Sequence, residues 1–316
     1  MSSKAVITVS VSARSLFRLE EFHEVYKAEG LSSYLNIVRQ RENEALLPGA
    51  AFPLVQALLR LNDLSGKRIV DVIVVSSMHP DAGLAILNAI ETHGIAVERA
   101  AFTSGGDVLP ILKAFGTDLF LSYSPADARR AVADGIAAAI MYDPPDEIET
   151  LGDQIRIAFD GDAVLFSEES ERIFKTQGKA AFFEHEHSNA RRPMEEGPFG
   201  KLLRAIDRIQ KSFPDGRKPF RIALVTARGG KARERVVRTL RAWDVAIDET
   251  YFLNGGEKGE ILRVFKPQIF FDDQDRHVSR AAKFVPAGLV PSMVPTASET
   301  TERDDAQSLL PKPGRR

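Results

Sequence analysis

The sequence predicts an α/β protein with a mainly parallel sheet, built as two tandem lobes that arose by internal duplication. Short apolar runs bounded by turn residues alternate with stretches of helical period along the chain, as they do in βα units. The pattern then recurs at a fixed spacing. Thr226 follows Ser76 by 150 positions, and Gly255 follows Gly105 by 150 positions. A constant offset at scattered positions is typical of a duplicated domain, although any two βα units share a general likeness.

Eight apolar runs are expected to be strands, four in each half, with helical stretches between them. In the first half the expected strands are Ala5–Val11, Val72–Val75, Asp118–Leu121 and Ala137–Met141. In the second half they are Ile155–Phe159, Arg221–Val225, Gln268–Phe271 and Gly288–Val290.

An acidic segment that contains two prolines, Asp143–Asp153, is expected to link the lobes, because it lies between strand-like runs and carries turn residues. We therefore expect one lobe at residues 1–146 and a second at residues 147–296. The last stretch, residues 297–316, is polar and lacks periodicity. Such a composition is typical of a disordered tail.

The overall composition excludes several classes of function. The 316 residues carry a formal net charge of -2, which gives no electrostatic reason to expect nucleic acid or an anionic membrane as a partner. The absence of cysteine excludes disulfides, thiolate nucleophiles and cysteine zinc sites. The N-terminus lacks the apolar core of a signal peptide, and no apolar run reaches the ~18 residues of a membrane span. We expect a cytoplasmic protein.

The strongest local signal is an apolar strand that runs directly into Asp160-Gly161-Asp162. Sites in parallel α/β sheets form beyond the carboxyl ends of the strands. Two carboxylates at such a place are unfavourable unless a cation compensates them, and Mg²⁺ prefers oxygen ligands. The alternative is a turn in which Asp160 and Asp162 cap a helix.

Three further groups of polar residues follow strands or turns in the second half. Thr226-Ala227-Arg228 follows the second strand, and a hydroxyl with a guanidinium suits a phosphoryl group; a helix cap with a surface arginine is the alternative. Lys258 follows a Gly-Gly turn and is either near the carboxylates or solvated. Asp272 and Asp273 end another apolar strand, and packing hardly explains two adjacent carboxylates there.

This ordered set of motifs resembles the four motifs of the haloacid dehalogenase superfamily. More specifically, segments from about residue 5 to residue 291 resemble the type I cytosolic 5′-nucleotidase family. The segments of the second half are RIAFDGDAVLFSEE, LVTAR, RTLRAWDVAIDETYFLNGGEKGEIL and FFDDQ. Those of the first half are VSARSLF, LLPGAAFPLV and AAFTSGGD. The resemblance implies two tandem Rossmann-like lobes of the haloacid dehalogenase type, with a small cap insertion in the C-terminal lobe.

The resemblance also implies a role for each motif. Asp160 would be the nucleophile that forms an aspartyl-phosphate. Asp162 would protonate the leaving oxygen and later deprotonate the attacking water. Thr226, with Ala227 and Arg228 beside it, would hold the phosphoryl group, and Lys258 would offset negative charge.

The metal implied by the resemblance is Mg²⁺. Its expected ligands are the carboxylate of Asp160, the backbone carbonyl of Asp162, and one of Asp272 and Asp273, with Asp273 preferred. Carboxylate attack on an anionic phosphate is repulsive unless a metal and a lysine neutralise the charge. The expected ligand set is therefore consistent with the expected reaction.

The first half lacks these groups at the corresponding positions. Only a serine hydroxyl is retained where the second half has a threonine. We therefore expect the first lobe to be catalytically silent. The correspondences are Val11 for Asp160, Ala13 for Asp162, Ser76 for Thr226, Val108 for Lys258, Ser122 for Asp272 and Tyr123 for Asp273.

The insertion between the first two motifs, about residues 168–209, is expected to form the cap and to select the substrate. Phe183 and Phe199 would stack on a base, with packing inside the cap as the alternative. Arg191 and Arg192 are interpreted as a solvated surface pair, although contact with substrate is the alternative. The segment Glu184–His187 is likewise interpreted as solvated, because two histidines at i and i+2 do not share a helix face; a zinc site is the alternative.

The motifs indicate hydrolysis of a phosphomonoester. The resemblance alone implies the substrate, and with it a Mg²⁺-dependent 5′-nucleotidase that hydrolyses nucleoside 5′-monophosphates, with a small-molecule nucleotide as its substrate. One alternative is a phosphatase for another small phosphomonoester, such as a sugar phosphate. A second is a nucleotide-binding regulator without catalysis. The preferred base, activation by nucleotides and homo-oligomer formation stay open.

Overall fold

The computed structural model describes residues 6–145, 152, 154–214 and 217–292. Their strands form one ten-stranded sheet in the order β3-β2-β1-β4-β5-β10-β9-β6-β7-β8. All neighbouring strands are parallel except β5 and β10. The strands are β1 Ile7–Val11, β2 Val70–Ser76, β3 Arg99–Phe102, β4 Leu119–Ser122, β5 Ala137–Met141, β6 Ile155–Phe159, β7 Phe220–Thr226, β8 Glu249–Phe252, β9 Ile269–Asp272 and β10 Ala287–Leu289.

Each half of the sheet has the same strand order. Counted from the start of its half, the order is third, second, first, fourth, fifth in both, and the two fifth strands pair where the halves meet. At this seam Gly288 lies opposite Met141. A Cβ atom on Gly288 would lie 2.9 Å from Cβ of Ala139, so only glycine allows this close approach of the halves.

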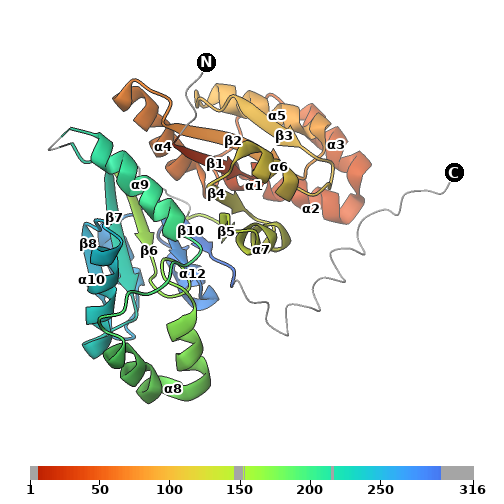
Figure 1. Ribbon diagram of the computed structural model, residues 1–316. Coiled ribbons are helices and arrows are strands. Elements are labelled where there is room, and N and C mark those ends of the chain that lie inside the picture. Colours follow the sequence, from red (N-terminus) through yellow and green to blue (C-terminus); the bar gives the residue numbers. More distant parts are fainter. Residues whose placement is uncertain (1–5, 146–151, 153, 215–216, 293–316) are drawn as a thin grey trace.

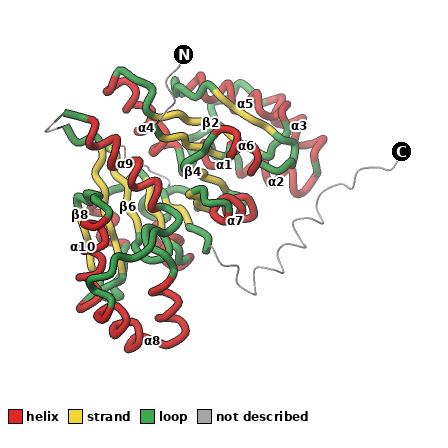
Figure 2. The backbone as a smooth tube through the Cα atoms, viewed as in Figure 1, coloured by secondary structure: helices red, strands yellow, loops and turns green. Residues whose placement is uncertain are grey.

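Helices cover both faces of the sheet, as Figure 2 shows, and the chain halves lie side by side in Figure 1. Apolar residues of α4, α5, α9 and α10 join one core that spans both halves. On the other face α6 and α7 cover the first half, and α11 and α12 the second. The helices are α1 Ala13–Leu16, α2 Glu20–Glu29, α3 Leu31–Gln40, α4 Phe52–Ser65, α5 Pro80–Thr92, α6 Leu109–Phe115, α7 Pro125–Ala133, α8 Glu169–Ser188, α9 Gly200–Ser212, α10 Arg233–Ala242, α11 Gly259–Phe265 and α12 Asp275–Ala281, with a 3-10 turn η1 at Gly230–Ala232.

The eight expected strands are confirmed, with ends that differ by no more than two residues. Two further strands, β3 and β8, were not expected. Both are four residues long and only partly buried, so their apolar pattern is weak. Most of the expected linker and the whole tail at residues 297–316 lie outside the described residues.

The expected cap needs a correction. Of its two helices, only α8 projects from the sheet (Figure 1), whereas α9 buries Leu202, Leu203 and Ile206 in the common core. A bent helical segment like α8 is also found in the first half. The first half has α2 and α3 at the corresponding place, separated at Gly30 with φ 83° and ψ -174°. Gly178 bends α8 with nearly the same angles, φ 82° and ψ 179°, a backbone conformation that favours glycine.

Candidate active site

Three carboxylates meet at the carboxyl ends of two neighbouring strands. Asp160 directly follows β6, while Asp272 ends β9 and Asp273 follows it. Because β6 and β9 are paired in parallel, their carboxyl ends lie at the same side of the sheet. One oxygen from each of the three side chains lies within 4.8 Å of the others. The structure therefore brings together three of the four expected metal-binding residues.

A buried lysine lies between two of these carboxylates. Lys258 occupies the position just before α11. Its Nζ donates to Asp160 and, at 2.6 Å, to Oδ2 of Asp272. Burial alone would lower the pKa of Lys258, but Asp160 and Asp272 raise it well above its usual value. Of the two positions left open by the sequence, Lys258 therefore takes the one beside the carboxylates and not the solvated one.

The lysine does not balance all three carboxylates. Burial, with Asp272 and Asp162 nearby, raises the pKa of Asp160 to about 7 despite Lys258. Burial, followed by the charges of Asp160 and Asp272, raises the pKa of Asp273 to about 9. Oδ1 of Asp273 is buried and has no hydrogen-bond partner within the part of the chain that the structure describes. A carboxylate oxygen without a donor in a group of acidic side chains is suited to a hard divalent cation.

Asp272 differs from Asp273 in its contacts. Besides Lys258, it accepts from the backbone N–H of Gln274 at 2.9 Å and lies 3.1 Å from Nδ1 of His277. Burial would raise the pKa of Asp272, but Lys258 and His277 hold it below its ordinary value. Asp272 is thus occupied by protein donors, whereas Asp273 has an oxygen left over.

Thr226 lies beside the turn that carries the first two aspartates. It ends β7, which pairs with β6, and it is buried. A Cβ atom on Gly161 would lie only 3.4 Å from the Thr226 hydroxyl oxygen. The hydroxyl oxygen also accepts from the backbone N–H of Arg228 at 3.2 Å. Ala227, between them, is exposed.

The guanidinium of Arg228 is buried and already paired. Its Nε and Nη2 donate to the two oxygens of Asp162 at 2.8 and 2.6 Å, and its Nη1 donates to Glu186 on α8. The sequence predicted that Arg228 would hold a phosphoryl group. This needs correction for the described arrangement, because the donors that would face an anion are engaged by two carboxylates.

The aromatic residues of the expected cap have different environments. Phe183 is half-buried, packs on Phe182 with ring centroids 5.4 Å apart, and lies near Gly230 in η1. Phe199 is fully buried against Phe159 and Phe271. The expectation that Phe199 stacks on a base is therefore wrong, since its ring forms part of the sheet core.

The polar residues of the cap are likewise divided. Arg191 and Arg192 are exposed, as expected for a surface pair. The segment Glu184–His187 was interpreted as solvated. This is right for Glu184 and His187, which are exposed, and wrong for His185 and Glu186. Glu186 is buried, and His185 lies 3.1 Å from Nη1 of Arg235. Among the described residues, the acidic group around Asp160 is the one cluster suited to a metal.

His277 and Glu186 were not expected at the site. His277 lies in the first turn of α12, five residues after Asp272. A helix that starts directly after the strand carrying Asp272 places its first turn near that carboxylate, so His277 could have been predicted from the sequence. Glu186 had no such signal, because its partner Arg228 is 42 residues away in the chain.

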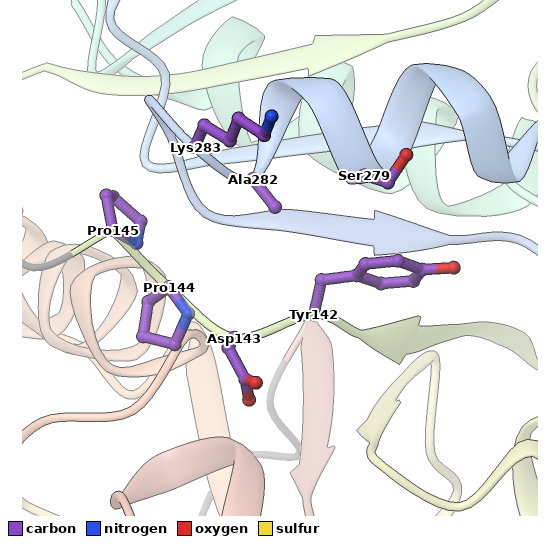
Figure 3. Close-up of a pocket in the computed structure, with 7 residues that line it drawn as sticks. All are labelled: Tyr142, Asp143, Pro144, Pro145, Ser279, Ala282 and Lys283. Atoms are coloured by element: carbon purple, nitrogen blue, oxygen red, sulfur yellow. The ribbon is translucent and has the colours of Figure 1, made fainter.

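A separate pocket of about 380 Å³ lies near the seam of the two halves. Figure 3 shows its two sides, one formed by the chain after β5 and the other by α12 and the residues that follow. None of the candidate site residues lines it. Its lining residues are Tyr142, Asp143, Pro144, Pro145, Ser279, Ala282 and Lys283.

No helix among the described residues combines the length and the apolar content that crossing a bilayer requires. Among solved structures, the crystal structure of histidinol dehydrogenase from Elizabethkingia anophelis is a remote match. It is 10% identical, with a TM-score of 0.23, over 90% of this chain and 52% of that chain. At this score the match carries no information on fold or function.

Sequence comparison is more informative. Human cytosolic 5′-nucleotidase 1B is 35% identical over 291 residues, which are 89% of this chain and 48% of the human protein. The chain thus spans about half the length of this curated relative. The sequence model of the 5′-nucleotidase family matches residues 1–297, nearly the whole chain and all of the candidate site. The chain belongs to the 5′-nucleotidase family.

Proposed function

We propose that the protein hydrolyses nucleoside 5′-monophosphates to nucleoside and phosphate, with Mg²⁺ bound at the acidic cluster. The observation that carries the proposal is the convergence of Asp160, Asp272 and Asp273 around Lys258 at the strand ends. Family membership supports phosphomonoester hydrolysis. The nucleotide as substrate, and a cytoplasmic location, are supported by the name of the human relative.

The residues present fit a divalent cation. Asp160 and Asp273 would be its carboxylate ligands, together with the backbone carbonyl of Asp162. The partnerless oxygen of Asp273 favours it over Asp272, which is engaged by Lys258 and His277. The bound ion would neutralise phosphate charge and so allow an anionic nucleophile to approach.

The reaction follows from the roles of the surrounding side chains. A carboxylate oxygen of Asp160 attacks phosphorus, and the bond from phosphorus to the 5′ oxygen breaks. Asp162 donates a proton to that oxygen, then accepts one from the water that hydrolyses the aspartyl-phosphate. Lys258 offsets the charge of Asp160, and the Thr226 hydroxyl donates to a phosphoryl oxygen. Each of these side chains already lies at a strand end or between a strand and the helix that follows it.

We also propose that the two halves are duplicated haloacid dehalogenase-type lobes, residues 1–146 and 147–296, and that the first is catalytically silent. The shared strand order supports this. Matching backbone angles support it further: φ is 84° at both Gly105 and Gly255, and 51° and 50° at Ser104 and Asn254. These pairs have the same offset of 150 positions as the sequence motifs.

Substrate selection is assigned to α8, the part of the expected cap that projects from the sheet. Its half-buried Phe183, near Gly230 after the threonine strand, is the aromatic residue best placed to meet a base. Aromatic stacking on a base is worth roughly 1–3 kcal/mol. Replacing Phe183 by alanine should therefore change the preference among nucleotides more than the rate on a small aryl phosphate.

The test is a phosphate-release screen over nucleoside 5′-monophosphates and sugar phosphates, each with Mg²⁺ and with chelator. The expected result is Mg²⁺-dependent release that is fastest with nucleotides. Faster release from sugar phosphates would establish the alternative substrate class. Nucleotide binding without turnover in Mg²⁺ would establish a non-catalytic regulator, and activity with zinc alone would contradict the assigned metal.

A further inference from the structure

Side chains of alternating charge connect the catalytic turn to α8 and α10. Asp162 is bound by Arg228, which also binds Glu186. Arg235 Nη1 donates to Glu186 at 3.0 Å, and its Nη2 donates to Glu169 at 3.2 Å. We call these five residues the buried ion chain, because its three central members have side chains no more than 2% exposed.

The central glutamate is held from several directions. Besides Arg228 and Arg235, Glu186 accepts from the hydroxyl of Ser170 at 2.7 Å. Ser170 lies at the start of α8 and Glu186 near its end, so the carboxylate binds both ends of the helix. A buried carboxylate held by three donors is fixed in orientation, and it fixes the guanidinium of Arg228 in turn.

The fold itself does not need these charges. At the corresponding positions of the first half, Val38 replaces Glu186, Met78 replaces Arg228 and Ala85 replaces Arg235. All three belong to or pack against the apolar core there. The same backbone arrangement is thus packed with apolar residues in one half and with ions in the other. Burying ions is costly compared with well-packed apolar residues, so a requirement of the site explains the ions better than the fold does.

We propose that Arg228 and Glu186 are positioning residues that orient the carboxylate of Asp162 toward the leaving oxygen and make that orientation depend on the docking of α8. This inference rests on the proposed function, in which Asp162 is the general acid. Arg228 contacts both oxygens of Asp162, which restricts the rotation of the carboxylate. Because Glu186 belongs to α8, displacement of the helix removes the second anchor of Arg228.

The experiment replaces three residues of the second half by the residues at the corresponding positions of the first half. The triple variant Glu186→Val, Arg228→Met and Arg235→Ala replaces the central ions by residues that the same backbone already accommodates. The rate of the first step, release of nucleoside or of 4-nitrophenol in a single turnover, is measured for two substrates. One is a nucleoside 5′-monophosphate, whose leaving oxygen needs a proton, and the other is 4-nitrophenyl phosphate, whose leaving group does not. We expect this rate to fall ~10²-fold or more on the nucleotide, as for loss of general acid help, and less than about fivefold on the aryl ester.

The matched control is Arg238→Met, which removes an exposed arginine of α10 that pairs with Glu234 and should leave both rates unchanged. Arg228→Lys carries the test if the triple variant does not fold, since lysine keeps the charge but lacks the fork that spans two oxygens. The same selective loss is expected from it, with KM for the nucleotide nearly unchanged.

Two results would overturn the inference. Equal loss on both substrates would show that the buried ion chain only supports the structure, and retention of the nucleotide rate would show that Asp162 needs no such anchor. Failure of the proposed function looks different, because the wild-type protein itself would then hydrolyse the nucleotide poorly or not at all.

Discussion

The two halves place different side chains in nearly the same buried positions. Asp160, Thr226, Lys258 and Asp272 are at most 5% exposed, and their first-half counterparts Val11, Ser76, Val108 and Ser122 are at most 8% exposed. Lys258 and Val108 even share backbone angles just before their helices, φ -82° and -84° with ψ -22° and -20°. The fold therefore accepts apolar or small neutral side chains at these places. Charges at equal burial are costly, and this contrast indicates that the second half keeps them for chemistry.

The largest expected difference between the halves concerns the nucleophile. Asp160→Asn keeps size and shape but removes the negative charge that attacks phosphorus, so kcat should fall by roughly 10⁴–10⁶, as when other covalent nucleophiles are removed. The matched change Val11→Ala should act only through packing, at about 0.5–3 kcal/mol of stability. Phosphate release from folded variants measures both. Near-normal turnover of folded Asp160→Asn would remove Asp160 from its proposed role.

The general acid should show the next largest difference. Asp162→Asn cannot donate the proton to the leaving oxygen, so kcat on a nucleotide should fall ~10²–10⁴-fold. Ala13→Ser, at the corresponding buried position of the first half, should leave turnover unchanged. A loss of the same size in the single-turnover release of 4-nitrophenol from 4-nitrophenyl phosphate, which needs no proton, would contradict an acid role for Asp162.

Substitutions at Lys258 and at its first-half counterpart Val108 should differ in their effect on the free energy of unfolding. Lys258→Met leaves Asp160 and Asp272 without their shared partner, and breaking a buried ion pair costs about 3–5 kcal/mol. Val108→Met enlarges a buried apolar side chain and should cost about 1–3 kcal/mol. Urea unfolding in chelator measures both variants. Relative to wild type under the same conditions, added Mg²⁺ should restore part of the loss in Lys258→Met and none of the loss in Val108→Met.

The last expected effect is the pH dependence of metal stabilisation. Burial raises the pKa of Asp160 to about 7 and of Asp273 to about 9. Because both are raised, the metal-free protein loses stability as pH rises from ~4, where the unfolded carboxyls ionise, through these values. Mg²⁺ competes with the bound protons. Its stabilisation should therefore grow from pH 6 to pH 8.5, by about 1.4 kcal/mol per pH unit for each displaced proton. If Mg²⁺ raised the free energy of unfolding by the same amount at pH 6 and at pH 8.5, this would argue against a cation at Asp160 and Asp273.

The sequence predicted the features that depend on local pattern and parallel topology. Buried strands read as apolar runs, and carboxyl ends of neighbouring parallel strands must meet, so Asp160, Asp272 and Asp273 could be placed together. The outer strands β3 and β8 begin with Arg99 and Glu249 and are only partly buried, which removes the signal of an apolar run.

Contacts between residues far apart in the sequence could not be predicted from local sequence patterns. Arg228 and Glu186 meet only because α8 folds back over the turn after β7. The residues next to each of them in the sequence do not predict this contact. Phe199 was misplaced for a related reason. The residues around it predict a helix start, but not whether its ring faces a cap or the sheet.

The antiparallel pairing of β5 with β10 gives the first half a structural task that does not depend on catalytic groups. Each of these strands has one neighbour in its own half and the other across the seam. Dividing the chain there would leave two edge strands with unpaired backbone N–H and C=O groups, which other chains can pair with. Gly288, which has no side chain to hold a foreign strand away, would make the exposed edge of the catalytic half especially easy to pair with. The first half thus covers, within one chain, an edge of the second half's sheet that other chains could otherwise pair with.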